Sequence, residues 1–190
     1  MISRRHTLSL LAAAQTEKNL RVVVRFETTL GDIVVALSGD RAPGTVENFL
    51  RYVDAGLYDG GVFHRTVKMD NQPQSPVKIE VIQGGPNLEK KQSFPPIPLE
   101  RTSRTGLKHV NGAISMARSG PDTATGDFFF CIGDQPKLDF GGKRNPDGQG
   151  FAAFGLVLKG HDVIRKIQKS PATGQRLSPP VKIDRLRRVE

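Results

Sequence analysis

The sequence predicts a mainly β domain in which a closed barrel of antiparallel strands is capped by two α-helices. Three observations lead to this fold class. Short apolar and β-branched runs recur along the chain with turn residues between them, and only two segments carry apolar residues at helical spacing. The chain has 190 residues, of which 37% are hydrophobic and 25% charged, and this suits one domain with a sizeable core.

The first predicted elements are a β-hairpin and a helix. Residues 22–26 and 33–37 show period-two patterning in β-branched and apolar residues, and residues 29–32 between them have turn chemistry. The next segment changes to helical spacing and begins with Pro43, a residue suited to a first helical turn. We therefore predict a helix over 43–55, with its apolar face made by Val46, Phe49, Leu50 and Val53.

The rest of the chain is again dominated by strands. Further runs of strand length occupy residues 62–65, 79–83, 113–117, 128–132, 152–157 and 181–189. A second helix is expected near 163–169. Prolines and glycines predict a surface loop over 68–78, a long irregular connection over 86–108 and a glycine-rich loop over 141–150.

Composition excludes several functions. The formal net charge is +9, but the basic residues are dispersed and form no basic helix or basic-aromatic motif, so we expect no nucleic-acid binding. Cys131 is the only cysteine, and the four histidines lack metal-ligand spacing, so we assign no metal. No segment is apolar for long enough to span a membrane.

The amino terminus has the pattern of an export signal. Arg4 and Arg5 precede a short apolar run over 8–14 that ends in three alanines, which is similar to a twin-arginine signal. We therefore expect a leader over 1–19, a folded domain over 20–190, and a periplasmic or exported protein. The alternative is a cytoplasmic protein with a disordered or trimmed leader.

Four short segments together carry two arginines, several aromatic residues and a pair of glycines. They are Phe63-His64-Arg65, Val81-Ile82-Gln83-Gly84-Gly85, Ser115-Met116-Ala117-Arg118-Ser119-Gly120-Pro121 and Phe128-Phe129-Phe130. With the Glu47-Asn48-Phe49 helix, their order along the chain resembles that of the cyclophilins. The resemblance implies an eight-stranded barrel with two helices, peptidyl-prolyl cis/trans isomerase activity and no cofactor. We then expect a monomer that acts on proline-containing polypeptides and assists protein folding.

The resemblance implies that Arg65 is the catalytic residue. Rotation about a peptide bond faces a barrier of ~18–20 kcal/mol, because resonance gives the bond double-bond character. A guanidinium that donates a hydrogen bond to the prolyl nitrogen favours the localised lone pair of the twisted transition state. One such charged hydrogen bond is worth roughly 1.5–3 kcal/mol, so Arg65 would supply only part of the acceleration.

The other implied site residues bind the substrate. They are His64, Gln83, Ala117, Arg118, Phe129, Leu138 and Phe151. Phe129, Leu138 and Phe151 would form the proline pocket, while Gln83 and the backbone of Arg118 would hold the peptide. From the residues alone, a phenylalanine in an apolar strand such as Phe129 is more often a core residue than a substrate contact. His64 could bind substrate or merely brace Arg65 through a hydrogen bond.

Some positions depart from the usual pattern of the cyclophilins. Glu80 and Val81 replace a common Phe-Met pair, which predicts a smaller pocket wall that could carry a charge. Asp127 replaces a common glutamine and could pair with Arg65, and Lys137 replaces a tryptophan found in many eukaryotic members. These changes keep open a second function, that of a proline-peptide binding module with weak or no turnover.

Overall fold

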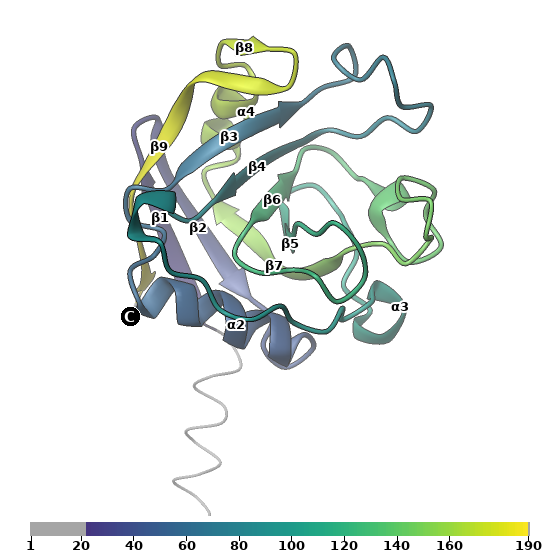
Figure 1. Ribbon diagram of the computed structural model, residues 1–190, viewed down its shortest axis with the longest axis horizontal. Helices are drawn as coiled ribbons and strands as arrows, with labels where there is room; N and C mark the ends of the chain where they lie inside the picture. The colour runs from purple at the N-terminus through teal and green to yellow at the C-terminus, as the bar shows by residue number, and fades with distance from the viewer. Residues whose placement is uncertain (1–21, 190) are drawn as a thin grey trace, which may run out of the picture.

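The computed structural model describes residues 22–189, and the predicted leader lies outside this range. Eight strands close into an antiparallel barrel in the order β1-β2-β7-β5-β6-β4-β3-β9, and β9 pairs with β1 to complete the ring (Figure 1). These strands are β1 Val23–Thr28, β2 Gly31–Leu37, β3 Val62–Val67, β4 Val81–Gly85, β5 Ala113–Met116, β6 Phe128–Cys131, β7 Ala152–Lys159 and β9 Arg176–Val189. The predicted fold class is confirmed.

Two helices cover the barrel at opposite ends (Figure 1). Helix α2, Pro43–Asp54, packs against β7 and β9, and the apolar face predicted for it is buried. Helix α4, His161–Gln168, packs against β2, β3 and β4. Both lie within a few residues of their predicted bounds.

The connection over 86–108 has more structure than predicted. It contains a 3₁₀ turn, Leu88–Lys90, and a one-turn helix α3, Thr102–Thr105. Ile97 also forms an isolated bridge to Ala124. These elements are too short to produce a hydrophobic period, so tertiary contacts determine them.

A two-residue strand was also missed by the sequence prediction. Strand β8, Ala172–Thr173, pairs with the beginning of β9, which starts five residues before the predicted run at Val181. The early part of β9 is exposed except for Leu177 and contains two prolines, so alternation gave no signal there. The resulting β8–β9 turn carries Gln175, which reaches the candidate site.

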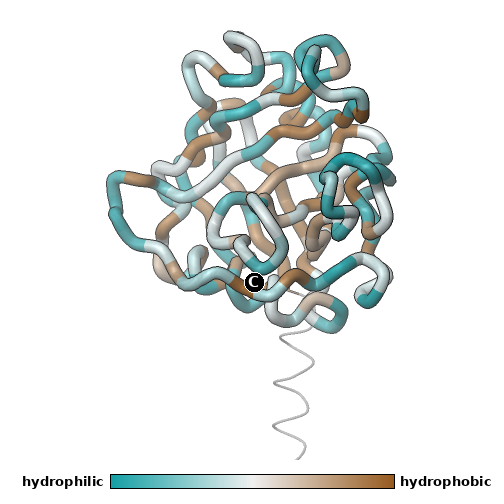
Figure 2. The backbone as a smooth tube through the Cα atoms, turned by 45° about the vertical axis from the view of Figure 1, so that its right-hand side comes forward, coloured by the Kyte–Doolittle hydropathy of each residue, from teal (hydrophilic) through white to brown (hydrophobic). Residues whose placement is uncertain are grey.

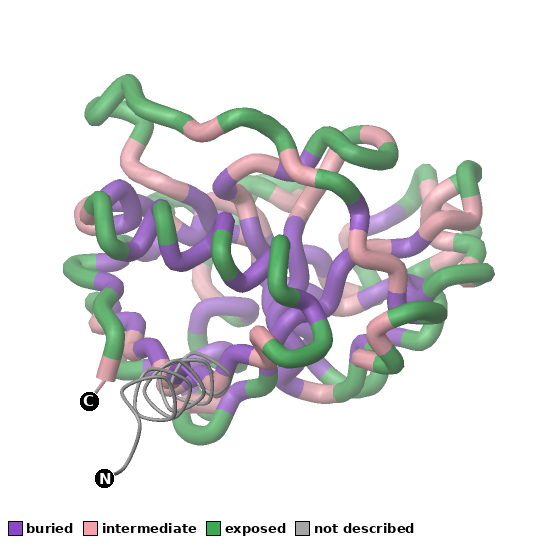
Figure 3. Tube along the Cα trace, turned by 90° about the horizontal axis from the view of Figure 1, so that it is seen from below, coloured by how far each residue is buried: buried purple, intermediate pink, exposed green. Residues whose placement is uncertain are grey.

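Two separate hydrophobic clusters lie on the two faces of the barrel wall. The larger one fills the interior with interlocking aromatic rings, among them Phe26, Phe49, Phe63, Phe128, Phe130 and Phe154. The smaller one lies outside the wall and is made of Val67, Ile79, Val81, Ala113, Phe129, Cys131 and Leu138. In Figure 2 the apolar segments gather in the middle of the molecule and the hydrophilic ones lie mostly in the outer loops, and in Figure 3 the buried segments lie toward the middle as well.

Within residues 22–189, no helix is long and apolar enough to cross a membrane.

Candidate functional site

The candidate site begins as one row of residues across four strands of the barrel. Arg65 on β3 lies opposite Gln83 on β4, Gln83 lies opposite Phe129 on β6, and Phe129 lies opposite Ser115 on β5. Residues paired in register point to the same face of a sheet. The row therefore gathers a guanidinium, an amide and an aromatic ring that are up to 64 residues apart in the sequence.

A β-bulge makes this row possible. Along a regular strand, Phe63 and Arg65 would point to the same face, because side chains alternate. The pairing of β3 with both neighbours shifts between these two residues, so His64 is the extra residue of a bulge. Phe63 is consequently fully buried inside the barrel, while Arg65 points outward into the groove.

Arg65 is held by two neutral amides. Its Nη1 donates to Gln83 Oε1 at 3.1 Å, and its Nε and Nη2 donate to Gln175 Oε1 at 2.9 and 2.6 Å. Among residues 22–189, no carboxylate lies within ion-pair distance of Arg65, and partial burial lowers the pKa of its guanidinium from the usual value. An arginine stays protonated in proteins. The amides thus orient the guanidinium without neutralising it, and Nη1 and Nη2 keep N–H groups for a substrate.

Asp127 acts on this arrangement through Gln83. Gln83 Nε2 donates to Asp127 Oδ2 at 3.3 Å, and His64 Nε2 lies 3.8 Å from the same oxygen. The predicted pair between Asp127 and Arg65 is therefore wrong, because Gln83 lies between them. His64 makes no hydrogen bond to Arg65 in the described part of the chain, so the bracing role considered for it is wrong as well.

An apolar pocket adjoins the row. Phe129 and Phe151 meet edge to face with their ring centroids 5.3 Å apart, and Leu138 is buried beside them. These three side chains and Arg65 line one groove of about 410 Å³. The groove also includes Ala117 and Gln83, as expected from the resemblance, and its remaining wall is made by Ile79, Val81, Arg118, Ser119, Thr123, Thr125, Asp127, Arg144 and Asn145.

The wall at the start of β4 differs from the prediction. Glu80 does not line the groove, since its side chain turns to the opposite face and accepts a hydrogen bond from Gln168 Nε2 at 3.0 Å. Ile79 and Val81 flank it and point into the groove. The wall is therefore apolar, and the negative charge considered for it is not there.

A buried histidine supports the pocket from below. The ring of His109 is parallel to Phe129 within 12°, with centroids 5.9 Å apart, and it is fully shielded from solvent. Its Nδ1 lies 2.7 Å from Asp139 Oδ1, and its Nε2 lies 3.0 Å from Ser115 Oγ. Because both ring nitrogens have hydrogen-bond partners, the His109 ring is held in one orientation, and it stabilises the position of the Phe129 ring stacked on it.

Replacing Asp139 by asparagine should make the protein less stable in a pH-dependent way. Burial raises the pKa of Asp139. Hydrogen bonds from the side chain and backbone of His109, together with the positive charge of Lys108, outweigh burial and leave the pKa of Asp139 below the usual value. A carboxylate with a lowered folded pKa stabilises the fold above the unfolded pKa of about 4, and this contribution disappears as the pH falls through the folded pKa. We expect D139N to lower the free energy of unfolding by about 1–2 kcal/mol at pH 7.

Thermal unfolding followed by circular dichroism at pH 7 and at about pH 3 checks this. The gap between D139N and the wild type should be wide at pH 7 and narrow in acid. Asp70→Asn is the matched control, because Asp70 is exposed and makes no hydrogen bond within residues 22–189. A gap of equal size at both pH values would mean that the charge of Asp139 is not what stabilises the fold.

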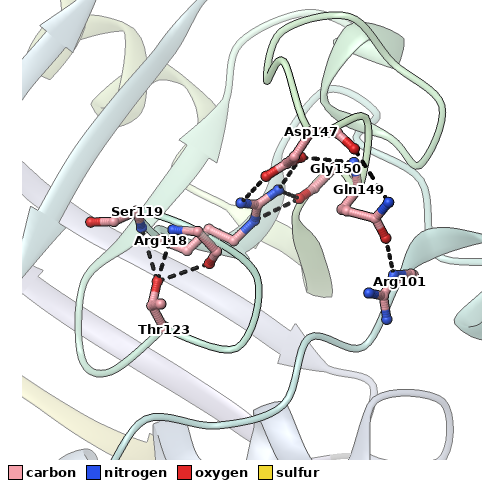
Figure 4. A network of polar contacts seen from close by, with 8 residues as sticks. Arg101, Arg118, Ser119, Thr123, Asp147, Gln149 and Gly150 are labelled. Atoms are coloured by element: carbon pink, nitrogen blue, oxygen red, sulfur yellow. Dashed lines mark hydrogen bonds and ion pairs between the residues drawn. The ribbon is translucent and has the colours of Figure 1, made fainter.

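Arg118 anchors the glycine-rich loop that borders the groove (Figure 4). Its side chain is 1% exposed and binds both carboxylate oxygens of Asp147, at 2.8 and 2.9 Å. Its Nε and Nη2 also donate to the carbonyl of Gly150, and its guanidinium lies 5.0 Å from the centre of the Phe151 ring. The Arg118 side chain thus positions Phe151 in the pocket.

Of the site residues predicted from the sequence, all but His64 line the groove. Arg65, Gln83, Ala117, Arg118, Phe129, Leu138 and Phe151 all line the groove. His64 and Lys137 do not, and they lie half-buried and exposed outside it. Gln175 and Arg144 were missed, because nothing in their local sequence connects them with Arg65. Residues 22–189 contain no group of acidic, histidine and cysteine side chains that could hold a metal ion.

Known proteins resemble the chain closely in sequence. Residues 23–188 match the family described as "Cyclophilin type peptidyl-prolyl cis-trans isomerase/CLD". A peptidyl-prolyl cis-trans isomerase of Streptomyces antibioticus is 38% identical over 149 residues, which are 76% of this chain and 82% of the relative. Peptidyl-prolyl cis-trans isomerase B of Escherichia coli is also 38% identical, over 80% of this chain and 87% of the relative.

The fold has solved counterparts as well. The crystal structure of a cyclophilin type peptidyl-prolyl cis-trans isomerase of Cryptosporidium parvum superposes with a TM-score of 0.72 and 21% identity, and covers 90% of this chain and 98% of its own. A second structure of that protein, in the presence of the dipeptide Ala-Pro, gives a TM-score of 0.71 and 22% identity, over 88% of this chain and 99% of its own. At 21–22% sequence identity, the similarity to these structures shows a shared fold and nothing further.

Proposed function

Because the chain belongs to the cyclophilin-type peptidyl-prolyl cis-trans isomerase family, we propose that it isomerises X-Pro peptide bonds in the groove beside Arg65. The single observation that carries this assignment of the site is the alignment of Arg65, Gln83 and Phe129 in one row next to an apolar pocket. The substrates are proline-containing polypeptides. A monomer would suffice to act on them, because residues of one chain form a groove with both the guanidinium and the apolar pocket.

The reaction requires that the C–N bond of the X-Pro amide lose its double-bond character. The proline ring lies in the pocket of Phe129, Leu138 and Phe151, which holds one side of the bond fixed. The free N–H groups of Arg65 point at the prolyl nitrogen and favour its pyramidal form, which exists only in the twisted state. Gln83 keeps Arg65 in position through the hydrogen bond to Nη1.

The chemistry needs no proton transfer and no covalent bond to the protein. Cys131, the one thiol, is buried, and the resulting desolvation raises the pKa of its sulfhydryl above the working range, so it stays protonated at neutral pH. The site acts by orienting the substrate and by electrostatic stabilisation of the twisted state, which are the effects that can accelerate rotation about the X-Pro bond.

A conformer-selective peptide assay tests the function. A proline-containing peptide that starts as a cis/trans mixture relaxes in tens to hundreds of seconds without catalyst. The protein should shorten this relaxation in proportion to its concentration. Binding of the peptide without faster relaxation would instead indicate a proline-peptide binding module.

We also propose that the protein is exported and folds clients outside the cytoplasm. The support is Arg4-Arg5 followed by the apolar run that ends at Ala14. In a bacterial host with a twin-arginine pathway, mass spectrometry of the mature protein should find a new amino terminus near Ala14. The R4K/R5K variant, which keeps the charge, should stay unprocessed. An intact Met1 terminus in both proteins would contradict export through this signal.

A further inference from the structure

The groove contains a second guanidinium that the reaction described above does not use. Arg144, in the glycine-rich loop, lines the same groove as Arg65. Its Nη1 donates to Gln72 Oε1 at 2.8 Å, Ser75 Oγ at 2.7 Å and the carbonyl of Val77 at 2.6 Å. These three acceptors belong to the loop between β3 and β4, so Arg144 joins two loops into one wall.

The charge of Arg144 is not neutralised by the protein. All three acceptors of its Nη1 are uncharged, and no carboxylate of residues 22–189 lies within ion-pair distance of it. The third arginine of the groove, Arg118, is different, because Asp147 binds it with both oxygens. Partial burial and the positive charge of Arg65 lower the pKa of Arg144, which means that the two cations are close enough to repel.

The charges of the groove are distributed asymmetrically along β4. Arg144 binds the chain at Val77, just before β4 begins. Asp127 lies at the other end of the strand, where a Cβ added to Gly85 would fall 2.1 Å from its Oδ1. Asp127 is the one acidic residue of the groove wall. A strand of this length spans about 17 Å. A peptide lying along it therefore meets the carboxylate of Asp127 at one end and, at the other, the guanidinium of Arg144, which no carboxylate neutralises.

We propose that Arg144 makes the enzyme selective for proline segments that carry an acidic side chain on the flank nearest Arg144. The proposal deepens the proposed function and rests on it. A substrate carboxylate next to Arg144 would form a charged hydrogen bond and would also reduce the repulsion between Arg144 and Arg65. The same carboxylate on the opposite flank would face Asp127 and be disfavoured. Specificity thus comes from attraction at one end and repulsion at the other.

The test measures kcat/KM for four peptides that share one Xaa-Pro core. Two carry glutamate before or after the core, and two carry glutamine at the same positions. We expect wild-type enzyme to prefer glutamate over glutamine about 3–10-fold on one flank, and to show no preference or the reverse on the other. Sodium chloride should weaken the preference.

The variants separate selectivity from loop architecture. R144Q should lose the preference for glutamate, so that its kcat/KM values on a glutamate peptide and on the matching glutamine peptide become equal within about twofold. R144K keeps the charge and should keep most of the preference. K143Q is the matched control, because Lys143 is the exposed neighbour and lies outside the groove wall, and it should behave as wild type.

Several results would overturn the proposal. An equal loss on glutamate and glutamine peptides in R144Q would mean that Arg144 only joins the loops. Equal rates on all four peptides with wild-type enzyme, or a preference that survives in R144Q, would exclude charge recognition by this residue. A wild-type protein that accelerates none of the four would overturn the proposed function together with this inference.

Discussion

Replacing Arg65 by alanine should lower kcat/KM on an X-Pro peptide by about 10–100-fold. The estimate follows from the loss of one charged hydrogen bond to the prolyl nitrogen, worth roughly 1.5–3 kcal/mol, at about 1.4 kcal/mol for each factor of ten. Some acceleration should remain, because the pocket of Phe129, Leu138 and Phe151 still holds the proline ring. The measurement is the conformer-selective peptide assay, with thermal unfolding as a check on folding.

Two further variants make this result specific to the guanidinium. R65K keeps a positive charge but cannot reproduce the fork that donates to Gln83 and Gln175, so it should recover little of the activity. Arg176→Ala is the matched control. Arg176 lies opposite Arg65 on β9, yet it is exposed and lies outside the groove, in a neighbouring hollow that it shares with His64, Arg65 and Gln175. Equal activity of R65A and the wild type would refute the role given to Arg65.

Replacing Phe128 by alanine should cost about 3–5 kcal/mol of unfolding free energy, the usual range for a large core aromatic. Phe128 is fully buried inside the barrel and packs against Phe26, Phe49 and Tyr58 at ring-centroid distances of 5.3–6.0 Å. Its removal leaves a cavity that the closed sheet cannot collapse to fill. Urea denaturation followed by circular dichroism gives the value, because the transition midpoint shifts with stability.

The adjacent residue should respond differently. Phe129 faces the groove, so F129A should lose most of its activity and less stability than F128A. Phe140→Ala is the control, since Phe140 is 45% exposed and its loss should change stability by no more than about 0.5 kcal/mol. If F129A were as unstable as F128A and kept its activity, Phe129 would belong to the core and not to the substrate pocket.

The eight barrel strands and the two capping helices could be predicted from local patterns. Residues 24–27 alternate between apolar and polar with period two, and the face of α2 that carries Val46 and Phe49 repeats at helical spacing, so these elements indicate their own buried side. The same periodicity placed Phe128 and Phe129 on opposite faces. Periodicity could not say which face was the interior, because both neighbours are phenylalanine.

The sequence by itself thus determined the barrel strands, the two capping helices and the fold class. Through the cyclophilin pattern it also predicted seven of the residues that line the groove, among them Arg65 and the three pocket residues. Only the tertiary structure decided how Arg65 comes to point outward, since the bulge at His64 breaks the alternation on which sequence reasoning depends. The tertiary structure also brought Gln175 and Arg144 to the groove from loops that carry no periodic signal. Hydrogen bonds between segments about 70 to 110 residues apart hold these side chains in place, and a local pattern contains no information about such distances.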